Sequence, residues 1–428
     1  MRACVLLAGL LLGFCVSAFA DTHVVSPDGS GDFPTIQAAI DAAVDGDVIT
    51  LTDGTFTGDG NRDLDYLGKA ITLQSQSGDP ATCVIDCEGS AADPHRGIQL
   101  ISGEPGGAAL VGISITGGHV FHPDYGSAVW CANGSTAAIS SCDISGNQGI
   151  AVWVQNNCTV SFADCRLAGN FGPTCGAIDA DGATLQVSRC DFIENASEWR
   201  VGAVFAMSSE VEIAGCQFVG NAAPEASAVE LNSGGVLSLS DCFFADNACT
   251  GIGGTVVLWI CSAAAVERCT FAGNTSADGC AAIYAHKVGE TRARNCTFWG
   301  NACPDGTILA DSYDFILENC ILAGATEGSA ISSPDDYATL SCCNIYGNAG
   351  GDWVGAIADQ YGTGGNICAD PLLCDPEHGD FRLDSASPCA PFSPQNPECD
   401  LAGAWPVGCG ASPVPAQTWG AVKALYRQ

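Results

Sequence analysis

The chain has 428 residues, of which 48 are acidic and 14 are basic, and its formal net charge at neutral pH is −34. A surface this acidic repels nucleic acid and anionic membranes, so we exclude both as partners. The charge is explained by solubility in a saline or extracellular setting. The alternative is calcium held by clustered carboxylates.

Residues 1–20 have the composition of an export signal. Arg2 precedes an apolar run from Val5 to Val16, and Ala18-Phe19-Ala20 offers a small-x-small cleavage site before Asp21. This pattern predicts a secretory signal peptide, so we expect a secreted or surface-associated protein. No later segment of the sequence is apolar and long enough to predict a membrane span.

Residues 21–66 are predicted to form an N-terminal cap and the first strands. Four apolar side chains share one face of a predicted helix: Ile36, Ala39, Ile40 and Ala43. Pro34 suits the first turn of this helix and Gly46 suits its end. We expect the helix to cover the open backbone edge of the first layer of the repeats that follow.

A six-residue phrase recurs nine times between residues 142 and 348: Cys, any residue, a large apolar residue, any residue, then usually Gly-Asn. The copies start at Cys142, Cys165, Cys190, Cys216, Cys242, Cys269, Cys296, Cys320 and Cys343. Successive copies are 23, 25, 26, 26, 27, 27, 24 and 23 residues apart. A period in this range indicates a solenoid.

Within each repeat the apolar residues alternate with period two, which predicts strands and excludes helices. Each repeat offers three short strands, the first of which carries one inward Val or Ile. These inward residues are Val129, Val152, Ile178, Val204, Val229, Val256 and Ile283. Three strands and three turns in about 25 residues make one coil of a parallel β-helix, with coils about 4.8 Å apart. We therefore predict an all-β right-handed parallel β-helix of eleven or twelve coils over residues 67–366.

The recurring phrase has a physical reason at each position. The small, soft cysteine side chain stacks on its copy in the next coil, and we expect the nine ladder cysteines to pack without disulfides. Gly and Asn tolerate the left-handed backbone of a corner. The asparagines are also expected to hydrogen-bond to one another along the stack. Disulfides are expected among the other cysteines, mainly after residue 367.

The C-terminal part divides into two predicted segments. Residues 367–410 are rich in cysteine and are expected to close the solenoid, while 411–428 form a proline-rich spacer and an aromatic, basic tail. The tail is either an attachment handle or a strip that packs over the last coil. Zinc is not expected, because no four-cysteine knuckle spacing occurs.

Three motifs together resemble the pectin-lyase-like superfamily of right-handed parallel β-helix proteins. They are the opening Asp28-Gly-Ser-Gly-Asp-Phe-x-Thr-Ile-Gln, the segment Asp-Gly-Asp-Val-Ile-x-Leu at 45–51, and the Cys-x-Phe-x-Gly-Asn coils. The closing segment from Ala369 to Cys389 is similar to the ends of secreted bacterial β-helix proteins. The resemblance covers residues 23 to 410 and implies the fold more specifically than the chemistry.

The catalytic motifs that the resemblance implies are incomplete. Where a pectin methylesterase needs aspartates and glutamines on adjacent coils, this chain has Trp153, Asp179 and Phe205. A pectate lyase needs calcium and an arginine or lysine base, and Arg292 lies in the basic cluster of the repeats. The alternative is that this cluster is a solvated face that offsets some of the negative charge.

One row of residues is the main candidate for ligand binding. The residue after each inward Val or Ile of the first strand points outward, which aligns one side chain per coil. The row is Trp130, Trp153, Asp179, Phe205, Glu230, Val257 and Tyr284. Aromatic rings in it are expected to stack on sugars while the carboxylates accept hydroxyl hydrogen bonds or hold calcium. The alternative is that the aromatic side chains only stabilise an exposed sheet.

We therefore carry two function classes forward, and the incomplete catalytic motifs favour the first. The first is an exported, non-catalytic β-helix protein of the cell surface or matrix that binds polysaccharide along an exposed strand face. The second is a polysaccharide lyase or glycoside hydrolase that acts on uronate-containing glycans, with Asp179, Glu230 and Arg292 as candidate catalytic residues. We expect a monomer without a certain cofactor, and calcium is the one candidate. The ligand and the disulfide connectivity do not follow from the sequence.

Overall fold

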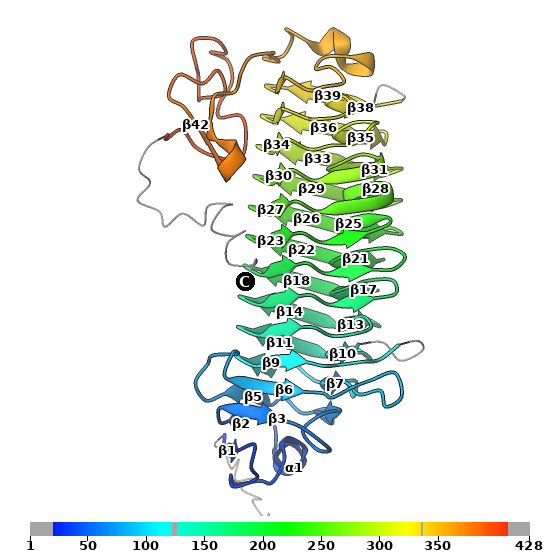
Figure 1. Ribbon diagram of the computed structural model, residues 1–428, viewed down its shortest axis with the longest axis vertical. Coiled ribbons are helices and arrows are strands. Elements are labelled where there is room, and N and C mark those ends of the chain that lie inside the picture. The colour runs from blue at the N-terminus through cyan, green and yellow to red at the C-terminus, as the bar shows by residue number, and fades with distance from the viewer. Residues whose placement is uncertain (1–19, 122–125, 335–336, 410–428) are drawn as a thin grey trace, which may run out of the picture.

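The computed structural model describes residues 20–121, 126–334 and 337–409. The predicted signal peptide, apart from Ala20, and the tail from residue 411 lie outside the described residues. The chain winds into a stack of coils, each of which adds one strand to each of three parallel sheets (Figure 1). The predicted parallel β-helix and its number of coils are confirmed.

Sheet I has 15 strands and carries the first strand of each repeat. Its strands are β4 (Leu64–Asp65), β7 (Ile98–Leu100), β10 (Val129–Cys131), β13 (Val152–Gln155), β16 (Phe171–Gly172), β17 (Ile178–Asp181), β20 (Ala196–Ser197), β21 (Val204–Met207), β24 (Ala222–Ala223), β25 (Ala226–Asn232), β28 (Ala248–Trp259), β31 (Thr275–Gly279), β32 (Ile283–His286), β35 (Ile308–Asp311) and β38 (Ile331–Ser332). The inward residues predicted for the first strands are all buried.

Sheet II has 13 strands and sheet III has 12. Sheet II contains β1 (Thr22–Val25), β2 (Val48–Leu51), β5 (Thr72–Ser75), β8 (Ala108–Val111), β11 (Thr136–Ser140), β14 (Thr159–Ala163), β18 (Thr184–Ser188), β22 (Glu210–Ala214), β26 (Val236–Ser240), β29 (Ala263–Glu267), β33 (Thr291–Arg294), β36 (Phe315–Glu318) and β39 (Ala338–Ser341). Sheet III contains β3 (Gly54–Phe56), β6 (Cys83–Asp86), β9 (Ser114–Thr116), β12 (Asp143–Ser145), β15 (Arg166–Ala168), β19 (Asp191–Ile193), β23 (Gln217–Val219), β27 (Phe243–Ala245), β30 (Thr270–Ala272), β34 (Thr297–Trp299), β37 (Ile321–Ala323) and β40 (Asn344–Tyr346).

The cysteine phrase lies at the corners on either side of sheet III. All nine ladder cysteines are buried and free, as predicted. Beside them, five phenylalanines stack with ring centroids 4.6 to 5.0 Å apart: Phe192, Phe218, Phe244, Phe271 and Phe298. This continuous column fills the core between the sheets because the coil spacing equals a comfortable ring separation.

Both residues of the Gly-Asn pair were predicted to adopt the left-handed backbone conformation, but only the glycine does so. Glycines such as Gly146 and Gly169 have positive φ and turn the corner, whereas the asparagines do not. Instead, each asparagine side chain donates to the side-chain oxygen of the next, at 2.9 to 3.1 Å, through seven coils. The predicted asparagine ladder is confirmed, and it satisfies polar groups that the corner would otherwise bury unpaired. The ladder runs through Asn147, Asn170, Asn195, Asn221, Asn247, Asn274 and Asn301.

A short helix covers the N-terminal end of the stack. Helix α1 (Ile36–Ala42) begins after Thr35, whose Oγ1 accepts a hydrogen bond from the backbone N–H of Ala38 at 3.3 Å. It buries Ile36, Ala39 and Ile40 and contacts β1, β2 and β4. The helix therefore has the predicted position and face, but it ends at Ala42, earlier than the predicted stop at Gly46.

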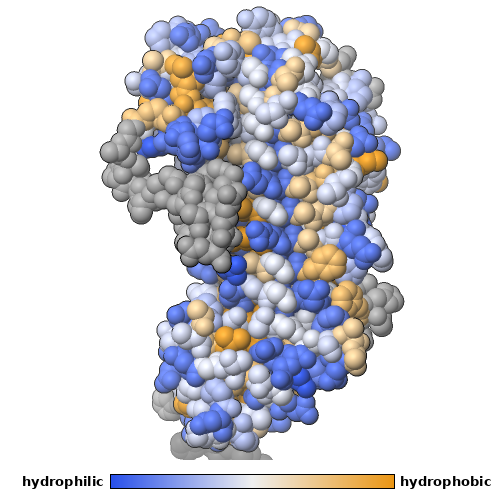
Figure 2. All heavy atoms as spheres, viewed as in Figure 1, coloured by the Kyte–Doolittle hydropathy of each residue, from blue (hydrophilic) through white to orange (hydrophobic). Residues whose placement is uncertain are grey.

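The closing segment folds back along the outside of sheet III rather than continuing the stack (Figure 1). It contains η2 (Pro376–His378) and the antiparallel pair β41 (Leu373–Asp375) and β42 (Asp380–Leu383), whereas η1 (Gly355–Gln360) precedes it and contacts β38 and β39 of the last coils. Its Trp405 indole donates to Thr270 Oγ1 at 2.8 Å, and its Phe381 ring lies 6.0 Å from that of Phe243. In the face shown in Figure 2, apolar residues form small, separate patches among polar ones.

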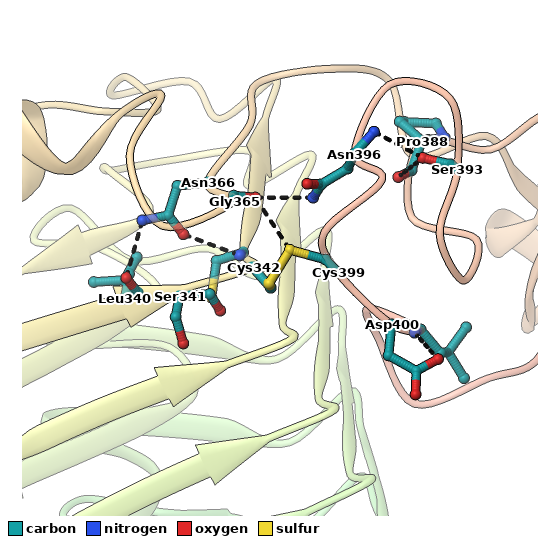
Figure 3. Close-up of a disulfide and its surroundings, with 12 residues drawn as sticks. Leu340, Ser341, Cys342, Gly365, Asn366, Pro388, Ser393, Asn396, Cys399 and Asp400 are labelled. Carbon is teal, nitrogen blue, oxygen red and sulfur yellow. Dashed lines mark hydrogen bonds between the residues drawn. A yellow bond between two sulfur atoms is a disulfide. The ribbon is translucent and has the colours of Figure 1, made fainter.

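Two disulfides brace this segment. Cys374 is bonded to Cys409 within it, and Cys399 is bonded to Cys342 in the last coils (Figure 3). Three of these four cysteines lie after residue 367, as predicted. The fourth, Cys342, was not predicted to form a disulfide. It directly precedes a ladder cysteine, and the corner residue at this position points away from the core, where it can reach the closing segment.

Candidate functional site

The predicted row of one residue per coil exists on the outer face of sheet I. The strand register pairs Trp130 with Trp153, Trp153 with Asp179, Asp179 with Phe205, and Phe205 with Glu230. It then continues through Val257 to Tyr284. The strands that carry the row, from β10 to β28, lie on the right side of the stack in Figure 1. Residues more than 150 positions apart in sequence are therefore aligned in space.

The expected exposure of this row is wrong for its middle part. Asp179 is 8% exposed and Glu230 is 2% exposed, and Phe205 and Val257 are also buried. The chain that leads into each first strand folds over the sheet and packs on the row, through Ile150, Cys175, Val201 and Ala226. Only Trp130, Trp153 and Tyr284 stay half-buried. The row is thus half-buried at its ends and covered in its middle.

Arg200 organises the covered cluster. Its Nη2 donates to Glu230 Oε1 at 2.6 Å, and its Nε lies 3.1 Å from an oxygen of Glu225. The guanidinium group also lies over the ring of Phe205, 4.3 Å from the centroid. Burial raises the pKa of Glu230, while the hydrogen bond from Arg200 opposes that rise. Arg200 thereby holds two carboxylates in one place.

Asp179 is the second buried carboxyl group of the row. Burial raises its pKa to about 7, and the negative charge of Asp181 adds to the rise while Arg200 opposes it. A neutral carboxylic acid is therefore substantially populated at neutral pH. Asp179 does not line the groove described below, since Phe205 separates it from Glu230 along the row.

This pKa makes the stability of the protein depend on pH. Between its ordinary pKa of 3.8 and about 7, folded Asp179 keeps a proton that the unfolded chain has lost, so the free energy of unfolding falls as pH rises. Asp179→Asn removes this loss. We expect the variant to gain at least about 1 kcal/mol on the wild type between pH 4 and pH 8 in urea unfolding. The exposed control Asp164→Asn should show no such gain, and an equal gain in both variants would contradict the assignment.

A groove of about 460 Å³ lies over the C-terminal half of the row. Glu225, Glu230 and Arg200 line it together with aromatic and apolar side chains. The other lining residues are Trp199, Pro224, Asn232, Gly251, Ile252, Val257, Trp259 and Tyr284. The Trp199 side chain is 60% exposed and stands at the rim. Aromatic side chains together with carboxylates are a composition typical of carbohydrate sites.

A second row, two residues further along each first strand, was missed. Its members also point outward, and the register places Asn232, Trp259, His286 and Asp311 side by side on successive coils. The rings of Trp259 and His286 stack at 4.3 Å, and His286 Nδ1 is hydrogen-bonded to Asp311 Oδ2. The alternation that predicted the first row also predicts this one, if it is followed for two more residues.

The N-terminal end of the first row is an aromatic platform. The rings of Trp130 and Trp153 stack with centroids 5.9 Å apart, and the Arg96 guanidinium lies 4.8 Å from the centroid of Trp130. The Trp130 indole Nε1 is buried without a hydrogen-bond partner. The tryptophans therefore stabilise each other, which leaves less of their faces for a ligand.

Arg292 does not belong to either row. It lies on β33 in sheet II, on a different side of the coil from Glu230 and Asp179. Its guanidinium is paired with Glu290 at 3.4 Å and with Glu318 at 3.2 Å. The structure thus separates Arg292 from the other two candidates, and it corresponds to the solvated face that was the alternative.

Within the described ranges, no group of three His, Cys, Asp or Glu side chains is arranged to hold a metal ion. Calcium therefore remains a prediction from charge alone. Likewise, no helix among the described residues has the length and hydropathy needed to cross a membrane.

A second hollow, of about 320 Å³, lies between sheet III and the closing segment. Its charged residues are Asp241 and Arg268, which form an ion pair at 2.7 Å, and Trp405 lies at its wall. Because both charged side chains are exposed and paired with each other, this hollow offers no buried carboxyl group. The groove on sheet I is the better candidate.

Comparison with known proteins agrees with the fold. The family described as right handed beta helix region matches residues 46–218 and 201–367. The chain belongs to this right-handed β-helix family. This is the fold that the resemblance of the sequence motifs to the pectin-lyase-like superfamily implied. No curated protein matches the chain significantly.

Solved structures similar to this β-helix protein are polysaccharide lyases and glycoside hydrolases. The PL6 family alginate lyase AlyGC is 13% identical with a TM-score of 0.51, covering 92% of this chain and 59% of that one. The pectate lyase Pel9A is 12% identical with a TM-score of 0.45, covering 92% and 96%. The catalytic domain of a GH87 alpha-1,3-glucanase is 11% identical with a TM-score of 0.42, covering 72% and 66%. At these identities the likeness shows the fold alone.

Proposed function

We propose that the β-helix protein binds a polysaccharide in the groove on sheet I and cleaves it by hydrolysis. The observation that carries this proposal is the pair of carboxylates at the groove, Glu225 and Glu230, held by the same arginine in different environments. The Glu230 side chain is 2% exposed, whereas that of Glu225 is 53% exposed. A pair of carboxyl groups in different environments, one buried and one half-exposed, is typical of a glycosidase.

The proposed reaction assigns one role to each carboxyl group. Glu230, whose pKa is raised by burial, donates its proton to the glycosidic oxygen as the bond to the anomeric carbon breaks. Glu225 accepts a proton from the water that adds to that carbon. One water is consumed, and each new sugar end carries a hydroxyl group. Arg200 is a positioning residue, since it reaches the substrate only through the two carboxylates.

Hydrolysis fits the described residues better than β-elimination. A lyase that acts on uronates needs a metal ion or an arginine or lysine base close to the carboxylate. The cation in the groove, Arg200, is engaged by Glu225 and Glu230, and Arg292 lies on another sheet. The uronate-directed lyase considered from the sequence is therefore not our choice.

A second candidate is glycan binding without cleavage, at the cell surface or in an extracellular matrix. The observation that favours it is that both carboxylate oxygens of Glu230 accept hydrogen bonds from Arg200, as in a structural ion pair. Two disulfides in the closing segment support an oxidising, extracellular location for either candidate.

An assay for new reducing ends tests the two candidates. Incubating the mature protein with a panel of polysaccharides should release reducing ends from one of them, and Glu230→Gln and Glu225→Gln should each lower that rate by at least about 100-fold. The matched control Glu210→Gln, on the outer face of sheet II, should keep the wild-type rate. Binding without any release, in wild type and variants alike, would favour the non-catalytic candidate.

A further inference from the structure

The charges around the groove indicate which sugars it accepts. We propose that the groove takes a glycan of uncharged sugars and rejects polyuronates. This inference rests on the proposed function, because it concerns the substrate class of the same groove. It differs from the uronate-containing glycan that the sequence offered as the substrate of the alternative, enzymatic function.

The first step is the balance of charge at the walls. Among the lining residues, Arg200 is the one cation, while Glu225 and Glu230 are both carboxylates. The exposed Asp181, on β17 two coils before Glu230, adds a further acidic group. The whole chain carries a net charge of −34, so the surrounding field does not offset this local excess.

The second step is that the positive charge of Arg200 already faces two carboxylates. Its Nε and Nη2 face the two glutamates at 3.1 and 2.6 Å, and its guanidinium face lies on Phe205. A carboxylate that entered the groove would therefore bring a third negative charge to a single cation. If it took Arg200 from the buried Glu230 instead, the loss would exceed what a new surface ion pair contributes.

The third step is what polyuronates require. Each uronate sugar carries one carboxylate, so a bound chain needs a cation or a metal ion every few ångströms to offset desolvation and repulsion. The described residues provide no cluster of metal ligands. The row and the groove provide carboxylates and aromatic rings instead, so several uronates in sequence would meet charge of their own sign.

Uncharged sugars meet suitable partners at the same positions. Trp199, Trp259 and Tyr284 offer ring faces on which sugar rings stack. The half-exposed Glu225 can accept hydrogen bonds from hydroxyl groups. The side-chain amide of Asn232 donates to Glu230 Oε1 at 3.2 Å and helps to hold that carboxylate in position. A hydroxyl-bearing chain therefore uses the carboxylates as acceptors, where a uronate chain is repelled.

Titration calorimetry with the mature protein at low ionic strength tests the inference. The probes are neutral gluco- and manno-oligosaccharides and, at equal length, oligogalacturonate and oligomannuronate. We expect a neutral oligosaccharide to bind at least about tenfold more tightly than either uronate. Added salt should strengthen the uronate binding, because it screens repulsion. If a uronate bound more tightly than the neutral oligosaccharides, this inference would be overturned and the proposed function would stand. If no probe bound, and no glycan on a wider array did either, both the inference and the proposed function would be overturned.

A pair of variants locates the repulsion. Glu225→Gln removes one negative charge at the groove, and Glu210→Gln removes one on sheet II, where the side chain is exposed. We expect Glu225→Gln to raise the affinity for oligogalacturonate about fivefold, as one charge at short range allows, and Glu210→Gln to change it less than about twofold. Equal effects of the two variants would show that the net charge of the protein, and not the groove, rejects uronates, and would overturn the inference.

Discussion

Replacing Arg200 with methionine is expected to lower the free energy of unfolding by about 3–5 kcal/mol, because it leaves a buried carboxylate without its cation. The Glu230 side chain is 2% exposed and takes its shortest hydrogen bond from Arg200. Methionine keeps apolar contact with Phe205, so the loss reports the charge rather than the packing. Chemical denaturation at pH 8 measures it, and the loss should shrink at low pH as Glu230 takes up a proton.

A matched ion pair provides the control. Arg189 and Asp164 are as close as 2.7 Å, but their side chains are 63% and 51% exposed. Arg189→Met should therefore cost less than about 1 kcal/mol. Adding Glu230→Gln to Arg200→Met should restore most of the loss, because the unpaired charge is then gone. Equal costs for Arg200→Met and Arg189→Met would show that Glu230 does not depend on its partner.

The asparagine ladder gives the second large effect. Asn221→Ala is expected to cost about 3–5 kcal/mol, because each buried group left unpaired costs about 1–3 kcal/mol. Asn221 Oδ1 accepts from the backbone N–H and the side chain of Asn195, and its Nδ2 donates to Phe192 O and Asn247 Oδ1. Alanine removes all of these bonds within a site that water does not reach.

Gln186→Ala is the control for the ladder variant, because this side chain is exposed on β18 and its loss should change stability by less than about 0.5 kcal/mol. Both variants are compared by urea unfolding and by melting temperature. If Asn221→Ala proved as mild as Gln186→Ala, the ladder would be a consequence of the corner geometry and not a source of its stability.

The fold could be predicted from the sequence because every repeat has the same pattern of cysteine, apolar, glycine and asparagine residues. The spacing of the cysteines sets the coil length, the inward residues of the first strands follow strict alternation, and the asparagines recur at the same corner. In a solenoid, equivalent positions in adjacent repeats must be neighbours in space. The register of Trp130, Trp153, Asp179 and Glu230 follows from that rule alone.

The candidate site was harder to predict, for a physical reason. Alternation tells which side of a strand a residue points to, but not what covers that side. The segments that precede the first strands vary in length from coil to coil, and they bury Asp179 and Glu230. Arg200 comes from one of these segments, so no repeat position predicts it. Trp259 and His286 were within reach of the repeat pattern, whereas Arg200 and Glu225 were not.

The most direct test of the groove is a crystal structure of the Glu230→Gln variant with the oligosaccharide that binds best. Our account predicts sugar rings against Trp259 and Tyr284, over strands β25, β28 and β32, with a glycosidic oxygen within hydrogen-bonding distance of residue 230. Sugar bound along sheet II, or in the hollow beside Trp405 with the groove on sheet I empty, would contradict it.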